Sequence, residues 1–144
     1  RVMIVGVPNK AGVASKIFAR IARHNIVVDD IIQTVYPDDN IADIGFTTGA
    51  TDAEEAQAVC KDLGKELGFK EVEIDKKVAK VSIVGIGMKT HTGVAAKMFN
   101  ALAEAKVNIE NIATSEIMIS CLVRLTDAEK ALKAVHAAFE LDKA

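Results

Sequence analysis

Two glycine-bearing loops hold the residues best suited to binding a small charged ligand. Each loop follows a short apolar run and precedes a helical pattern, one at residues 7–12 and the other at residues 86–93. The first amides of a helix have no partner within the helix, so they attract a carboxylate. Gly12 and Gly93 would let a ligand approach the backbone, although the same glycines could equally serve only the turn.

A bound amino acid would also need acceptors for its ammonium group and a partner for its side chain. Polar residues in two β-branched runs have suitable groups: Gln33 in the first run, Asn108 early in the second, and Thr-Ser-Glu at 114–116. A polar side chain in an apolar strand needs a hydrogen-bonding partner, which can be a ligand or neighbouring backbone. The residues alone leave both interpretations open.

Signatures of catalysis are scarce. The chain has no Ser/His/Asp order with a nucleophile elbow, no Cys-x-x-Cys and no His-x-x-x-His. Gly85-Ile86-Gly87 resembles the start of a dinucleotide motif, but Thr90 stands at the third glycine, which favours a simple turn. His24 and His136 fall on predicted helices, whereas His91 lies in the second loop, where it could touch a ligand or remain solvated. These patterns favour binding over catalysis.

The elements that must position these groups occur twice along the chain. Three blocks recur in the same order: 1–7 with 80–86, 12–18 with 93–99, and Thr-Asp-Ala-Glu at 51–54 and 126–129. Repeated blocks of this kind indicate two copies of one structural unit.

Each copy predicts the same succession of elements. The expected elements are a strand (2–6; 80–85), a helix (12–25; 93–106), a β-branched strand (26–34; 107–114), a further strand, which alternates over 117–123 in the second copy, and a helix that a Thr-x-x-Glu capping box begins. Residues 71–75 predict one more strand, without an equivalent after the last helix. We therefore expect an α+β fold with two ferredoxin-like βαββαβ units, 1–76 and 77–144. Their antiparallel sheets would carry helices on one face, and the terminal edge strand of the second unit would be missing or exchanged.

Composition excludes several functional classes. Half of the 144 residues are hydrophobic, only 4% are aromatic, and the net charge is −2. Without a basic, aromatic face we expect no nucleic-acid partner, and without a long apolar run or a signal peptide we expect no membrane association. Cys60 and Cys121 fit cores and a reducing compartment, so we expect a cytoplasmic protein. Because it starts at Arg1 without Met, the chain is expected to be part of a longer protein.

The second copy carries the clearest resemblance to a known family. Its residues 81–88 (VSIVGIGM), 93–99 (GVAAKMF), 107–117 (VNIENIATSEI) and 134–141 (AVHAAFEL) closely resemble the tandem ACT domains of aspartate kinases. The resemblance covers essentially the whole chain, and residues 108–116 are its most specific part. It implies that both units are ACT domains.

The resemblance also implies a function. Aspartate kinase uses ATP to phosphorylate the side-chain carboxylate of aspartate, at the head of lysine, threonine and methionine synthesis. A pair of ACT domains binds threonine, lysine or both, and inhibits a catalytic domain or subunit that this chain does not contain. The chain itself is therefore expected to be no enzyme and to hold no cofactor, since ATP and Mg²⁺ belong to the kinase domain. Such pairs form homodimers in which ACT units join sheets, with effectors at the interface.

Site residues follow from the loops, the polar groups and the resemblance together. The expected effector-binding residues are Asn9, Lys10, Ala11, Gly12, Val13, Ala14, Gln33, Asn108 and Ile109. A possible second effector site comprises Met88, Lys89, Thr90, His91, Gly93, Val94, Ala95, Ser115 and Glu116. Asn9 stands where many relatives have Asp, and Met118 where they usually have a basic residue. Asn9 offers no charge to a lysine ammonium, and the change at Met118 could alter the second site. Both departures favour threonine over lysine.

Three alternatives remain. The pair could chiefly drive oligomerisation with degenerate pockets, or it could regulate another amino-acid-controlled enzyme. A small stand-alone enzyme or RNA binder on a ferredoxin-like fold is disfavoured, because the chain lacks a catalytic constellation and its strands are poor in aromatic residues.

Overall fold

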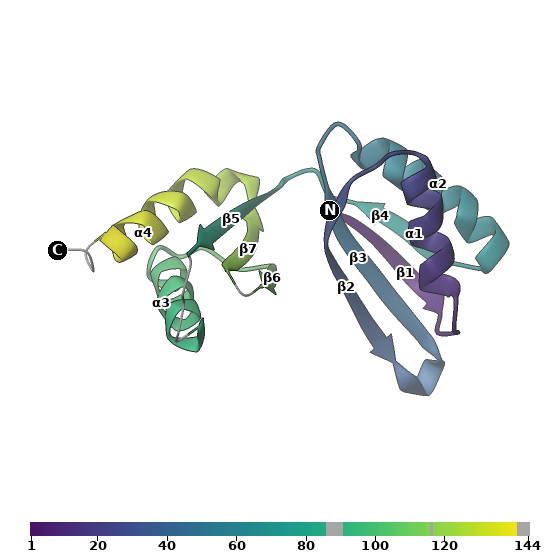
Figure 1. The fold of residues 1–144 in the computed structure, drawn as a ribbon, viewed down its shortest axis with the longest axis horizontal. Coiled ribbons are helices and arrows are strands. Elements are labelled where there is room, and N and C mark those ends of the chain that lie inside the picture. Colours follow the sequence, from purple (N-terminus) through teal and green to yellow (C-terminus); the bar gives the residue numbers. More distant parts are fainter. Residues whose placement is uncertain (86–90, 116, 141–144) are drawn as a thin grey trace. The chain divides into compact units, whose positions relative to one another are not determined.

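The chain folds into two compact units, Arg1–Lys76 and Lys77–Ala144. Figure 1 shows the computed structural model, which describes residues 1–85, 91–115 and 117–140. In each unit two helices cover one face of an antiparallel sheet, which confirms the predicted α+β fold.

The first unit has a four-stranded sheet in the order β2-β3-β1-β4. Its elements are β1 (Val2–Pro8), α1 (Val13–Arg23), β2 (Val28–Tyr36), a 3-10 turn (Pro37–Asp39), β3 (Ile41–Thr48), α2 (Ala53–Leu67) and β4 (Glu71–Ile74). Alternate residues of the central strands, such as Ile4 and Ile44, face the helices and are buried with Ile17 of α1. Phe18 meets Phe46 edge-on, with ring centroids 5.9 Å apart.

Two β-bulges interrupt the ladders of the first unit. In β1 the bulge lies between Ile4 and Val7 and includes Gly6, whose φ is 70°. In β2 it lies between Asp29 and Ile32. Each bulge adds one residue to its strand relative to β3, so the alternation of side chains changes phase at that point.

The second unit has a three-stranded sheet in the order β5-β7-β6 among the described residues. Its elements are β5 (Val78–Val84), α3 (His91–Glu104), β6 (Asn111–Thr114), β7 (Met118–Arg124), a 3-10 turn (Leu125–Asp127) and α4 (Ala128–Glu140). Both ladders run without a register shift. The core gathers Met98 and Leu102 of α3, Val135 of α4 and the inward face of β7.

The first helix of each copy ends in the same way. Asn25 and Lys106 adopt φ of 57° and 61°, just beyond α1 and α3. The next amide, of Ile26 or Val107, donates back to the last turn of the helix, as in a Schellman motif. The chain thereby turns at equivalent places toward β2 and β6.

Several local predictions were wrong. Helices α2 and α4 do begin within the two Thr-Asp-Ala-Glu segments, but Asp52 is the N-cap of α2 and no side chain caps that helix, so the predicted capping box does not form there. The strand predicted over 107–114 begins only at Asn111. In β7 both faces are buried from Ile119 to Val123, so the predicted alternation of residue types is not an alternation in exposure.

The two cysteines occupy the cores, as predicted. Cys60 lies in the first core and Cys121 in the second, and both thiols are free. Burial raises the pKa of each thiol to about 11, so neither is a ready nucleophile. Over the described parts of the chain, the search for a helix with the length and hydropathy to cross a membrane finds none.

Candidate functional site

The first loop presents its backbone to solvent at the start of α1. Asn9 donates its N–H to the Asn40 carbonyl at 3.1 Å, and Lys10 donates to the Pro8 carbonyl at 3.0 Å, which fixes the turn. Residues 9–12 are exposed. Gly12 is the N-cap of α1 with φ of 90°, and nothing lies within 4 Å of the position that a Cβ would take. A ligand could therefore approach this backbone closely.

The start of α1 is electrostatically suited to an anion. Its first intrahelical hydrogen bond runs from the Lys16 N–H to the Gly12 carbonyl at 3.1 Å, and the Val13 N–H donates to the Lys10 carbonyl at 3.3 Å. The amides of Ala14 and Ser15 therefore face the helix end. The first turn holds no acidic residue. The helix dipole thus favours a carboxylate here. Val13 and Ala14 are half-buried and pack on the first core, which anchors the turn.

Gln33 lies on the same side of the sheet as α1. It stands opposite Ile44 of β3, a core residue, and its own side chain is exposed because β2 is the edge strand. Strand β3 separates β2 from β1, so Gln33 lies about 10 Å from β1 across the sheet. Along the strands Gln33 is level with Ile4, because both pair with Ile44, whereas the first loop begins beyond Pro8 at the end of β1. Gln33 and the start of α1 therefore share a side of the sheet but lie at different positions along it.

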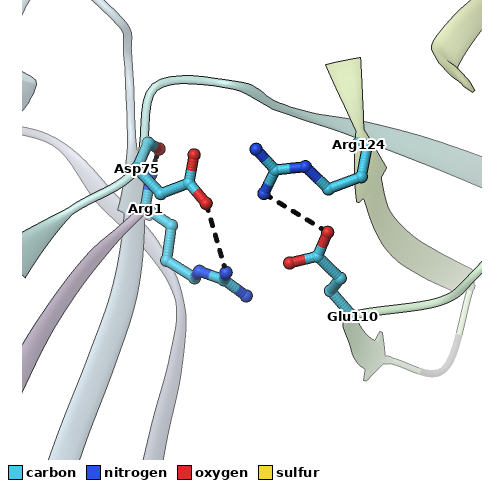
Figure 2. A network of polar contacts seen from close by, with 4 residues as sticks. All are labelled: Arg1, Asp75, Glu110 and Arg124. Atoms are coloured by element: carbon cyan, nitrogen blue, oxygen red, sulfur yellow. Dashed lines mark hydrogen bonds and ion pairs between the residues drawn. The ribbon is translucent and has the colours of Figure 1, made fainter. Parts of the chain in front are cut away.

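Asn108 and Ile109 lie in the second unit, between α3 and β6. Asn108 is exposed, whereas Ile109 is half-buried against the second core. The segment is held by the Glu110 N–H, which donates to the Leu122 carbonyl at 2.8 Å, and by an ion pair of 3.4 Å between Glu110 and Arg124. Figure 2 shows this pair.

The other pair in Figure 2 belongs to the first unit. The Arg1 guanidinium lies 3.5 Å from the Asp75 carboxylate, and the two backbones exchange hydrogen bonds of 2.8 and 2.9 Å. These contacts continue the pairing of β1 with β4 by one residue.

The structure describes only part of the possible second effector site. Met88, Lys89, Thr90 and Glu116 lie outside the described residues. His91, Gly93, Val94 and Ala95 belong to the start of α3, with Val94 and Ala95 packed on the second core. Ser115 is exposed in the turn between β6 and β7, and its hydroxyl accepts the Ile117 N–H at 3.4 Å.

Sequence reasoning missed Asp43, which links the first loop's strand to β2. Its carboxylate accepts the bulged Gly6 N–H at 3.1 Å and the Tyr36 hydroxyl at 3.1 Å. This hydrogen bond, together with the charge of Asp43, raises the pKa of Tyr36. An acidic residue inside an otherwise apolar strand was the available signal. Asp43 stabilises the end of β1 that leads into the loop.

No cluster of three or more metal-binding side chains occurs among the described residues. Neither His24 nor His136 belongs to such a cluster. His24 ends α1 and lies 3.3 Å from Glu55, and His136 is exposed on α4. The start of α1 is an open surface lined by backbone amides.

Comparisons with known proteins match this architecture. The ACT domain family matches residues 1–64 and again residues 81–139. An aspartate kinase of Pseudomonas fluorescens is 46% identical over 142 residues, which are 99% of this chain and 34% of that protein. The ligand-free regulatory subunit of aspartate kinase from Thermus thermophilus is 41% identical with a TM-score of 0.88, and the match covers 96% of this chain and 91% of that one.

A more distant structure contains an amino acid. E. coli aspartokinase III in complex with lysine and aspartate is 25% identical with a TM-score of 0.67, and the match covers 94% of this chain and 30% of that one. The chain spans about a third of the length of the curated relatives it matches. Its two units, its coverage of the Thermus regulatory subunit and its sequence identity show that the chain is a tandem pair of ACT domains and belongs to the regulatory regions of aspartate kinases.

Proposed function

We propose that this chain is the feedback sensor of an aspartate kinase and that threonine is its effector. Membership in the regulatory regions of that enzyme supports an allosteric role, and the lysine complex of E. coli aspartokinase III supports an amino acid as the ligand. The partner would be the catalytic domain or subunit of the kinase, in the cytoplasm. Lysine is the second candidate effector, at the site around the start of α3.

The edge strand β2 carries this proposal. Among the described residues β2 pairs with β3 alone, and its Ile31 and Val35 are 53% and 41% exposed. An apolar, unpaired edge is a template for another strand. We infer that β2 meets an ACT unit of a second copy of the chain, which makes a homodimer and covers Gln33. The second copy would contribute its Asn108 and Ile109.

The chemistry of the open surface fits a neutral amino acid. The amides at the start of α1 would bind the carboxylate, and the side-chain oxygens of Gln33 and Asn108 would accept hydrogen bonds from the ammonium group. Asn9 is neutral, so the surface offers no carboxylate to a lysine ammonium at that position. These features favour threonine over lysine at this site.

Calorimetric titration of the Gln33→Ala variant with threonine tests the proposed effector site. A hydrogen bond to a charged group contributes about 1.5–3 kcal/mol, so the variant should bind threonine at least about 10-fold more weakly in calorimetry. Thr34→Ala is the matched control, because Thr34 is an exposed neighbour on the same strand that faces the other side of the sheet. It should bind threonine like the unaltered chain. Equal affinities for the two variants would contradict the proposed role of Gln33.

The exposed apolar edge also favours a second function, oligomerisation without a ligand. In that case sedimentation would show a dimer for both the unaltered chain and Gln33→Ala, and no proteinogenic amino acid would release or absorb heat. Threonine binding that is lost with Gln33→Ala, in a chain that still dimerises, would exclude this alternative.

A further inference from the structure

We propose that Asp30 and Thr47 are positioning residues for the effector site. They hold the bulge in β2 that turns Gln33 onto the helix-covered face of the sheet. The inference rests on the proposed function, since it concerns a residue of the same site. It adds two residues that would not touch the effector themselves.

The bulge decides which way Gln33 faces. Val28 pairs with Thr48 and packs on the core, and Gln33 pairs with Ile44, which also lies in the core. Between these pairs β2 has four residues and β3 has three. Val28 and Gln33 are five positions apart, so in a regular strand they would face opposite sides. The extra residue in β2 puts both on the side of α1.

Side chains of β3 and β2 hold the extra residue in place. The Thr47 hydroxyl lies 3.1 Å from the Asp29 carbonyl and 3.3 Å from an Asp30 carboxylate oxygen, so it can donate to either. Asp30 has φ of 48°, and its N–H donates to the Asp29 carboxylate at 3.0 Å. Asp is one of the few residues that adopt this left-handed conformation readily. Bulges beside functional sites commonly re-aim a side chain in this way.

The second unit allows a comparison at the position that matches Thr47. Because Val2 pairs with Phe46 and Val81 with Cys121, the register places Leu122 where the first unit has Thr47. Leu122 has no hydroxyl, and β6 pairs with β7 without a register shift. From Asn111 to Thr114 the ladder with β7 has no extra residue, whereas at the matching stretch of the first unit the bulge in β2 lies beside Thr47.

Thr47→Val tests the proposal against a close control, Thr48→Val. Each substitution removes one hydroxyl from β3, and Thr48 bonds the Val27 carbonyl at 2.9 Å, before the bulge begins. We expect Thr47→Val to bind threonine at least 10-fold more weakly. Thr48→Val should stay within twofold of the unaltered chain while losing a similar amount of thermal stability. Equal affinities for the two variants would overturn the proposal.

Substitution of Asp30 gives an independent pair. Asp30→Asn keeps a side-chain acceptor and tolerates a positive φ, so it should retain binding. Asp30→Val keeps neither property and should lose binding as Thr47→Val does. Full binding by Asp30→Val would contradict the proposal even if the threonine variants fail to fold.

A measurement without ligand tests the role of the bulge separately from the proposed binding of threonine. Backbone proton contacts in NMR between Gln33 and Ile44 should be present in the unaltered chain, Thr48→Val and Asp30→Asn, and lost in Thr47→Val and Asp30→Val. Persistence of these contacts in the latter two variants would overturn the role of the bulge. If the unaltered chain binds neither threonine nor lysine, the proposed function fails, and the NMR contacts still decide whether Asp30 and Thr47 set the direction of Gln33.

Discussion

The two ACT units share a repeat in sequence but differ in the regularity of their sheets. In the first unit, Asp43 and Thr47 project from β3 and bond to bulges in β1 and β2. At the matching places of β7 stand Met118 and Leu122, and both ladders of the second unit run in continuous register. Two polar residues on one central strand thus distinguish a sheet with two bulges from a regular one.

The units also differ at the opposite edge of the sheet. In the first unit β4 lies along β1, and the Gln57 side-chain amide donates to the Val72 carbonyl at 3.2 Å. At the equivalent place in the second unit, a groove of about 400 Å³ runs between β5 and α4, and Leu132, which takes the place of Gln57, is exposed. Within the described residues, no strand covers that edge of β5. Among the described residues, the edge of β5 is therefore more open than the corresponding edge of β1.

The largest expected effect comes from the unequal cores. Phe46 and Cys121 occupy equivalent, fully buried positions, but only Phe46 has a large ring, packed against Phe18. Phe46→Ala should lower the free energy of unfolding by about 3–5 kcal/mol, because it removes the ring and leaves a cavity. Cys121→Ala should cost much less, since it deletes a single sulfur atom. Denaturant unfolding followed by circular dichroism measures both, and similar losses would show that the two cores are equivalent after all.

A smaller effect should follow from straightening the bulge in β1. Gly6 has φ of 70°, and a Cβ there would lie 2.6 Å from the Lys70 Cβ. Gly6→Ala should therefore destabilise the chain by about 1–3 kcal/mol, the usual cost of a strained backbone conformation. Gly49→Ala is the control, because nothing lies within 4 Å of its added Cβ. Thermal unfolding should separate the variants, and an unchanged midpoint for Gly6→Ala would argue against the bulge.

The smallest expected effect is a change in the pH dependence of stability, from acidic residues of β4. The described part of the second unit has no strand equivalent to β4. The Glu71 carboxylate beside Glu73, through a hydrogen bond and its charge, raises the pKa of Glu73 above its ordinary 4.5. A raised folded pKa gives stability that is present below the unfolded value and is lost as the pH rises through the folded value. Glu73→Gln should therefore gain stability relative to the unaltered chain as the pH rises from 4 to 7.

Glu54→Gln supplies a control of opposite sign. Lys76 bonds the Glu54 carboxylate at 2.8 Å and lowers the pKa of Glu54. Its stabilisation is present at neutral pH and is lost as the pH falls through the folded value. Glu54→Gln should therefore be less stable than the unaltered chain at pH 7, and the difference should shrink at low pH. Parallel pH profiles for the two variants would contradict the assigned interactions.

Much of this architecture is predictable from the sequence, because it depends on apolar periodicity and on a repeat. Helices α2 and α4 begin within the repeated Thr-Asp-Ala-Glu, and β2 and β6 lie at or near the β-branched runs, although β6 begins only at Asn111. The bulges are not predictable in the same way, since they depend on hydrogen bonds from β3 to residues far away in sequence. Asp29 and Asp30, adjacent in an apolar run, were the visible signal. The direction of Gln33 could not be read from strand alternation alone, because the bulge reverses it.

Calorimetric titration of the chain with threonine and with lysine, separately and together, decides whether the open surface of the first unit is an effector site. We predict a saturable heat with threonine that Gln33→Ala reduces at least about 10-fold in affinity and that Thr34→Ala leaves unchanged. Absence of heat with threonine, or binding that is indifferent to Gln33, would contradict the assignment.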